Sequence, residues 1–150
     1  MARAGIENRN PLNVKQDRGA RGPWNGSTGE DGRDHVIFCS PEYGLRAAIR
    51  TIAKKFKYGP ISTLELIALY TDDPTENDVE AYAAFVAGKL HRGVEEDLYI
   101  FDQAGNIEAE PELRRLIRAM AMYETGAGLV ICQSVLESAI WLYRADFNKE

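Results

Sequence analysis

The stretch Ser40–Phe56, SPEYGLRAAIRTIAKKF, contains the clearest fold signal in the chain. Ser40 is a favoured helix N-cap, Pro41 suits the first helical position, and Glu42 suits the positive end of the helix dipole. Apolar residues then recur at helical spacing until Gly59-Pro60 ends the pattern. The sequence therefore predicts an amphipathic helix with one core-facing stripe. The stripe consists of Leu45, Ala48, Ile49, Ile52, Ala53 and Phe56.

Four further helices are predicted downstream. A capping box, Ser62-Thr63-Leu64-Glu65, opens a short helix that ends near residue 70. Thr75 can cap a third helix over about 75–90, and a fourth spans about 111–126. The last helix, over about 129–143, is apolar nearly all round, so we expect it to be the central and most buried one.

The rest of the chain is less regular. Residues 1–34 hold six of the thirteen glycines and predict irregular loops with at most a short hairpin. Leu98–Phe101, followed by Asp102–Asn106, is typical of a short strand and a turn. A length of 150 residues corresponds to about one domain. We therefore predict a single, mainly α domain over 1–150 (α+β at most), with 1–34 as its loop-rich N-terminal part.

Composition excludes several classes of protein. Hydrophobic residues make up 45% and charged residues 27%, which is typical of a globular chain. The net charge of -5 disfavours nucleic acid as a partner, because neutralising phosphates needs a surplus of Lys and Arg. No window approaches the roughly 18 apolar residues of a membrane span. We therefore expect neither nucleic acid nor a membrane among its partners.

The first residues predict synthesis in a reducing compartment. Met1–Asn10 is polar and lacks the apolar run of a signal peptide. Cys39 and Cys132 are therefore predicted to be free thiols, of the kind that usually behave as small buried hydrophobes. His35 and His91 have no ligand-like spacing, and no CxxC motif occurs, so we expect no metal and no cofactor.

Glu124 is the residue that stands out chemically. The apolar stripe of the fourth helix, at 113, 116, 117 and 120, continues to position 124 and predicts that Glu124 faces inward. Partial burial and the negative end of the helix would both raise the pKa of this carboxyl. A carboxyl with a raised pKa is what a general acid needs to protonate a glycosidic oxygen. The alternative is that the helix frays by residue 123 and Glu124 points into solvent.

Several short motifs lie in a fixed order along the chain. The opening, GIENRNPLNVK over 5–15, is similar to the pattern GIRNNNPGNIR, and FCSPEYGLRA over 38–47 fits FxSPEYGLRA. Together with further matches, they resemble a family of phage virion and prophage proteins related to the lysozyme-like, lytic-transglycosylase superfamily. The resemblance covers about residues 5–126. The further matches are Trp24-Asn25-Gly26, Glu76-Asn77-Asp78, Tyr82, Val86 and Glu124-Thr125-Gly126.

The motif order and three positions depart from that superfamily. In lysozyme-like enzymes the helix that ends in Glu-Ser or Glu-Thr comes first, whereas here it follows the Asn-rich segment, which we interpret as a circular permutation. Leu12 stands where the family has Gly, and Glu7 and Arg9 replace Arg and Asn. These changes indicate either an altered specificity or an enzyme that has become a structural part.

The resemblance implies a catalytic pair, Glu124 and Tyr82. The Tyr82 hydroxyl would position the glutamate or the sugar, and both side chains would share the floor of one groove bordered by residues 8–13. The alternative is that Tyr82 is a core tyrosine. Because both parts of the family pattern should meet in space, we also predict that residues 8–15 pack against the helix that begins at Pro41.

The resemblance also implies a set of glycan-binding residues: Asn8, Asn10, Asn13 and Trp24. Each has a structural alternative. The three asparagines can be turn formers, since Asn tolerates left-handed geometry and bonds nearby backbone. Trp24 can pin down an irregular segment instead of stacking on a sugar.

The function that follows is cleavage of the bond between N-acetylmuramic acid and N-acetylglucosamine in peptidoglycan glycan strands, by a lytic transglycosylase or a muramidase. One carboxyl suffices for a transglycosylase, whereas a hydrolase usually needs two, and Glu76 and Asp78 are the nearest second acids. The alternatives are a non-catalytic virion structural protein with the same fold, contacting other virion proteins, and a glycan-binding module. The protein would occur in the virion, or in the host cytoplasm after synthesis, and act at the bacterial cell wall.

Overall fold

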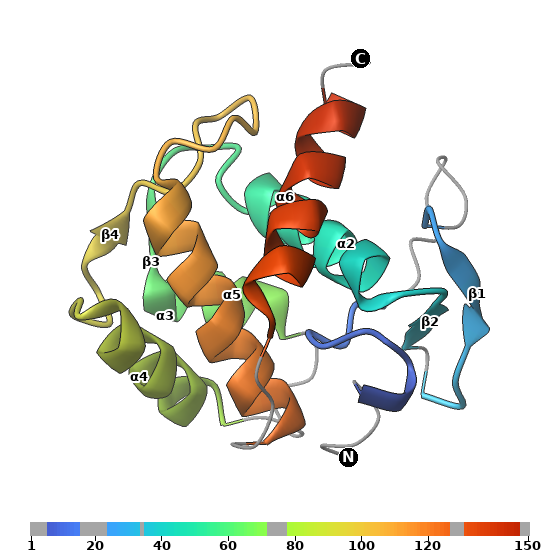
Figure 1. The fold of residues 1–150 in the computed structure, drawn as a ribbon. Coiled ribbons are helices and arrows are strands. Elements are labelled where there is room, and N and C mark those ends of the chain that lie inside the picture. Colours follow the sequence, from blue (N-terminus) through green and yellow to red (C-terminus); the bar gives the residue numbers. More distant parts are fainter. Residues whose placement is uncertain (1–5, 16–23, 34, 72–77, 127–130, 148–150) are drawn as a thin grey trace. The chain divides into compact units, whose positions relative to one another are not determined.

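The computed structural model describes residues 6–15, 24–33, 35–71, 78–126 and 131–147. Helices dominate these ranges, which confirms the predicted fold class (Figure 1). The chain divides into two compact units, unit 1 with residues 1–50 and 124–150 and unit 2 with residues 51–123. The prediction of one domain over 1–150 stays a prediction. The elements are β1 (Ser27–Glu30), β2 (Val36–Phe38), α2 (Pro41–Lys54), β3 (Ile61–Ser62), α3 (Thr63–Tyr70), α4 (Val79–Leu90), β4 (Asp97–Leu98), α5 (Glu110–Thr125) and α6 (Gln133–Phe147).

The helix α2 begins at Pro41, as the cap signal predicts. All six residues of its predicted stripe are buried. The helix ends at Lys54, and a turn closed by the hydrogen bond from the Gly59 amide to the Phe56 carbonyl follows before Pro60. Most of α2 lies in unit 1, and its last turn, from Thr51, lies in unit 2.

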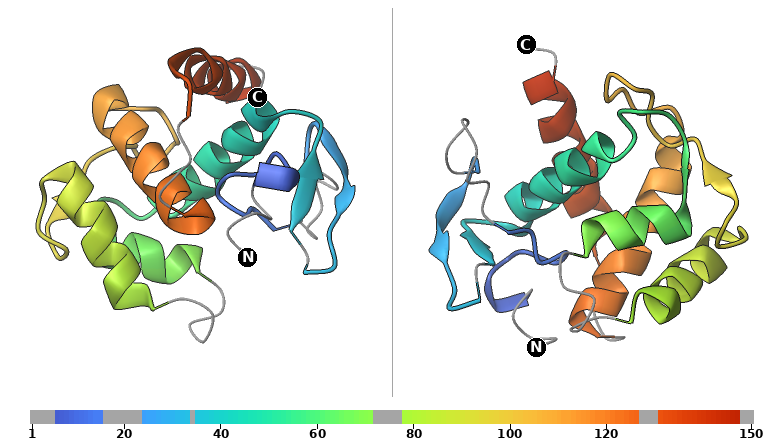
Figure 2. Two further views of the ribbon diagram at one scale, coloured as in Figure 1. Left: turned by 60° about the horizontal axis from the view of Figure 1, so that its bottom comes forward. Right: turned by 180° about the vertical axis from the view of Figure 1, so that it is seen from behind.

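Unit 1 contains the predicted short hairpin. The strands β1 and β2 are antiparallel, with Ser27 opposite Phe38 and Glu30 opposite Val36. Both views of Figure 2 show this hairpin beside the N-terminal part of α2. On another side of α2, the buried Arg46 forms an ion pair of 2.6 Å with Asp146 of α6. The first strand-rich segment and the last helix are thus both held to α2.

The segment 8–15 packs against the start of α2, which confirms that prediction. A Cβ atom added to Gly44 would overlap the carbonyl oxygen of Arg9 and lie 3.1 Å from the Cα of Asn10. The segment is also tied to β2, because the Phe38 amide donates to the Asn8 carbonyl over 2.8 Å. Glycine at position 44 therefore allows two backbones to touch.

Unit 2 is built from α3, α4, most of α5 and the small β3–β4 sheet. The predicted capping box is present, since the Ser62 side chain accepts from the Glu65 amide and the Glu65 side chain accepts from the Ser62 amide. The helices α3 and α4 lie side by side (Figure 1). Tyr82 and Phe85 of α4 contact Tyr123 of α5 through their rings. Helix α4 therefore packs against both α3 and the end of α5 that lies in unit 2.

The prediction for the last helix is wrong. Helix α6 spans Gln133–Phe147 and buries only one face, with Leu136, Ile140 and Tyr143 inside. Trp141 is 68% exposed. Apolar residues all round a helix do not show which side chains other elements cover. In α6 only one stripe of side chains is buried.

Three smaller expectations need correction. The helix α4 begins at Val79 with Asp78 as N-cap, accepting from the Ala81 amide, whereas the predicted cap, Thr75, lies outside the described residues. The strand β4 spans only Asp97–Leu98, so it begins one residue before the predicted start at Leu98. Both cysteines are exposed instead of buried, although the prediction of two free thiols is confirmed. Among the helices that the structure describes, none has the length and apolar character needed to cross a bilayer.

Candidate functional site

Glu124 lies in the last turn of α5, which continues to Thr125 and breaks at Gly126, where φ is +94°. The glutamate is half-buried. The helix therefore does not fray by residue 123, and Glu124 is neither fully buried nor fully exposed. A carboxylate at this end of a helix faces the partial negative charge of the last carbonyls.

Asn13 holds the Glu124 side chain. Its Nδ2 donates to Oε1 of Glu124 over 3.0 Å, across 111 positions of sequence. Asn13 has φ of +52°, the left-handed conformation that Asn tolerates better than most residues, and its amide closes a turn on the Asn10 carbonyl over 2.9 Å. Its Oδ1 is buried and has no hydrogen-bond partner among the described residues. This turn thus presents one donor to the carboxyl and one acceptor beside it.

Asn10 supports the turn from inside the protein. It is fully buried, and its Nδ2 donates to the carbonyls of Val14 and Val36, each over 2.9 Å. Its Oδ1 accepts from the Val14 amide over 2.9 Å. Because this side chain is fully buried and its amide group is hydrogen-bonded to the backbone, it is not accessible to a glycan. Its position supports the structural alternative for Asn10.

Asn8 is also buried and bonded within the protein. Its Nδ2 donates to Oδ2 of Asp31 over 2.8 Å. Burial alone would raise the pKa of Asp31, but hydrogen bonds from two backbone amides and from Asn8 outweigh it and hold that pKa below its ordinary value. No sequence motif predicted a role for Asp31, although its place beside Gly32 is typical of a turn. The pair fixes the first half of the asparagine segment to the hairpin.

Trp24 and Leu12 also hold this segment. The indole Nε1 of Trp24 donates to the Lys15 carbonyl over 3.0 Å, and the ring is partly exposed. This bond supports the alternative in which Trp24 pins an irregular segment. Leu12 is fully buried in the core of the unit.

Tyr82 lies in unit 2, whereas Glu124 belongs to unit 1. It is fully buried, and its ring stacks on that of Tyr123 with centroids 4.1 Å apart and an interplanar angle of 15°. This position fits the alternative of a core tyrosine. The groove that Tyr82 and Glu124 were predicted to share stays a prediction. Of the two candidate second acids, Asp78 caps α4 and Glu76 lies outside the described residues.

The contact described at this site joins the Glu124 carboxyl to the Asn13 side-chain amide. In the ranges that the structure describes, no group of three or more His, Cys, Asp or Glu side chains could hold a metal ion. A carboxyl is the group that a general acid needs, and this one accepts a hydrogen bond from a neighbouring side-chain amide. The fold and site define a mainly helical protein with a candidate acid–base carboxyl.

Comparison with known proteins relates the chain to bacteriophage. No model of a known protein family matches it. Protein P5 of Pseudoalteromonas phage PM2 is 36% identical to the chain over 91 residues, which are 59% of this chain and 56% of the phage protein. The chain thus spans about half the length of the curated relative it matches. The predicted phage connection is supported, and the name of the relative states no activity.

Proposed function

We propose that this phage-related protein cleaves the glycosidic bond between N-acetylmuramic acid and N-acetylglucosamine in bacterial peptidoglycan, with Glu124 as the general acid. The observation that carries the proposal is the hydrogen bond from Asn13 to Glu124. It joins the two most distant motifs of the family pattern, the opening asparagine segment and the late Glu-Thr-Gly.

The Asn13 Nδ2 group can only donate, so Oε1 of Glu124 accepts this hydrogen bond. In the proposed reaction, the protonated Glu124 carboxyl supplies the proton. That proton passes to the glycosidic oxygen, the bond from this oxygen to C1 breaks, and the electron pair stays on the oxygen. The 6-hydroxyl oxygen of the muramic acid then bonds to C1 and returns its proton to Glu124. In the hydrolytic variant, water replaces the 6-hydroxyl.

Digestion of purified peptidoglycan by the wild-type protein tests the proposal, with the products identified by mass spectrometry. Products that end in 1,6-anhydromuramic acid would establish the transglycosylase, and reducing muramic acid ends would establish the muramidase. The similarity to a phage protein is equally compatible with a competing function, a virion part without activity. Absence of both products, across pH values and with peptidoglycan from several hosts, would support that function. Co-sedimentation with undigested peptidoglycan would then indicate a glycan-binding module.

The variant Asn13→Asp tests the role of Asn13 as a positioning residue. Aspartate has the same shape and tolerates the left-handed backbone, but it replaces the amide donor with a carboxylate that repels Glu124. The pKa of the acid should rise, which moves the alkaline limb of the kcat/KM profile upward by on the order of one pH unit. Loss of the positioning bond should lower kcat roughly tenfold to a hundredfold.

Asn13→Gly is the matched control, because it removes the same donor without adding a charge and suits a positive φ. It should lose activity to a similar extent, with a smaller movement of the pH profile. A profile that is identical in all three proteins would contradict a contact between Asn13 and the catalytic acid.

A further inference from the structure

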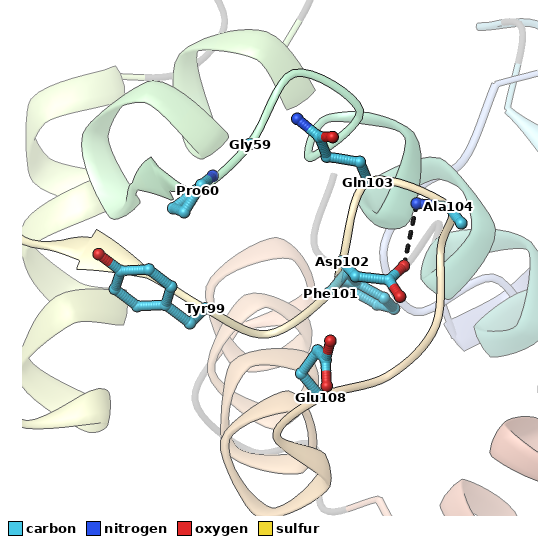
Figure 3. Close-up of a pocket in the computed structure, with 8 residues that line it drawn as sticks. All are labelled: Gly59, Pro60, Tyr99, Phe101, Asp102, Gln103, Ala104 and Glu108. Carbon is cyan, nitrogen blue, oxygen red and sulfur yellow. Dashed lines mark hydrogen bonds between the residues drawn. The ribbon is translucent and has the colours of Figure 1, made fainter.

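Unit 2 contains a hollow that the proposed function does not use. It has a volume of about 540 Å³ and lies between the turn before β3 and the loop that joins β4 to α5. This volume falls within the range of roughly 300–1,000 Å³ that is usual for small-molecule sites. Figure 3 shows the ring of Tyr99 and the ring of Pro60 on one side, and three polar side chains on the other. The polar side chains are Asp102, Gln103 and Glu108.

The walls of the hollow are fixed by the local backbone. The Ile100 carbonyl accepts from the amides of Glu108 and Ala109 over 2.7 and 3.3 Å. Under the loop, Phe101 is buried and packs on Phe56 with ring centroids 5.5 Å apart. Gly59, on the opposite wall, has a φ of +116° and faces Gln103, whose Nε2 would lie 3.9 Å from an added Cβ. The hollow is therefore formed before any ligand arrives.

Asp102 is committed to this architecture. Its Oδ1 accepts from the amides of Ala104 and Asn106 over 2.9 and 2.8 Å, and its Oδ2 accepts from Asn106 Nδ2 over 2.8 Å. The side-chain hydrogen bond from Asn106, followed by the backbone bonds, lowers the pKa of Asp102. It therefore stays a carboxylate that shapes the turn. The groups left to meet a ligand are the Tyr99 ring, the Gln103 amide and the Glu108 carboxylate.

We infer that this hollow is a saccharide-binding site. Tyr99 is 64% exposed, and its ring can cover the apolar C–H face of a sugar, while the carboxylate and the amide take the hydroxyls at its edge. None of the lining residues is basic, which disfavours anionic ligands. With Asp102 bonded within its turn, Glu108 is the one other carboxylate among the described residues that line the hollow, and one carboxylate alone binds a cation weakly. The choice of an N-acetylated sugar as ligand rests on the proposed function, whereas the site itself does not.

The test is titration of the ¹⁵N-labelled protein, residues 1–150, with a β-1,4-linked trimer of N-acetylglucosamine. Amide signals of residues 99–108 should shift in a saturable way. Tyr99→Ala should weaken the affinity roughly tenfold, which is the scale of losing one aromatic contact and its buried area. Tyr58→Ala is the matched control, because Tyr58 is 87% exposed, precedes Gly59 and does not line the hollow. It should leave the affinity unchanged.

The cation probe, the control variant and Glu124→Gln decide whether the saccharide site is overturned. Ethylammonium chloride serves as a cation probe, and shifts at 99–108 with this salt but not with the trimer would assign a cation site and overturn the inference. Equal weakening by Tyr58→Ala and Tyr99→Ala, or no shift with either probe, would also overturn it. Glu124→Gln should bind the trimer at 99–108 as the wild type does, so that a failure of the proposed catalysis is distinguishable from a failure of this site.

Discussion

Glu124→Gln is expected to lower the rate of peptidoglycan cleavage by at least about a hundredfold, because general acid catalysis contributes roughly 10²–10⁴. Glutamine has the shape of glutamate, and its Oε1 can still accept from Asn13 Nδ2. What it lacks is the acid proton. The rate of release of soluble muropeptides, measured on the same peptidoglycan preparation, gives the comparison with wild type.

The control for this prediction is Glu137→Gln. Glu137 is exposed on α6, and its Oε1 accepts from Gln133 one turn earlier over 3.1 Å. This variant removes the same charge at a site without a proposed role, so its activity should equal that of the wild type. Both variants should unfold at temperatures close to that of the wild type. A fully active Glu124→Gln protein would exclude Glu124 as the acid.

Gly44→Ala is expected to destabilise the protein by about 1 to 3 kcal/mol, the usual cost of forcing extra atoms into a packed site. The added Cβ would overlap the Arg9 carbonyl oxygen, which belongs to the backbone and cannot rotate away. Either α2 or the asparagine segment must move. Because the segment carries Asn13, the same variant should also lose activity. Urea denaturation gives the free energy of unfolding.

Gly88→Ala is the matched control on α4. Position 88 is exposed, and no atom lies within 4 Å of an added Cβ. Alanine there should raise the free energy of unfolding by roughly 0.5 to 1 kcal/mol, since glycine is the more flexible residue in the unfolded chain. Replacing glycine by alanine is thus expected to lower the free energy of unfolding in α2 and to raise it in α4. A Gly44→Ala protein as stable as Gly88→Ala would contradict the close packing of residues 9–10 on α2.

Local signals predicted most of the fold. The cap at Ser40, the stripe of α2 and the capping box at Ser62 each depend on residues within a few positions of one another, and all three are confirmed. The start of α4 was not predicted correctly, because Thr75 and Asp78 are both residue types that favour a helix N-cap. The local sequence does not show that Asp78 is the N-cap. For α6, the exposure of Trp141 depends on what packs against the helix, which no local pattern contains.

The candidate site needed longer-range information. Periodicity predicted that Glu124 faces inward, and the family resemblance brought the asparagine segment near it. Neither could show which asparagine makes the contact. That choice depends on the left-handed backbone at Asn13 and on the burial of Asn10 under it. The hollow beside Tyr99 had no signal in the sequence, because it arises from two loops that only the folded chain brings together.

The discontinuity of unit 1 has a consequence for synthesis on the ribosome. Unit 2 is one continuous segment, 51–123, whereas unit 1 needs residues 1–50 and 124–150. All residues of unit 2 are therefore translated while unit 1 still lacks α6 and Glu124. The bond from Asn13 to Glu124 spans 111 positions, and loops of this length close slowly. A nascent chain that stops at Tyr123 contains the complete second unit but not Glu124, so the activity proposed here can arise only after residue 124 has been translated.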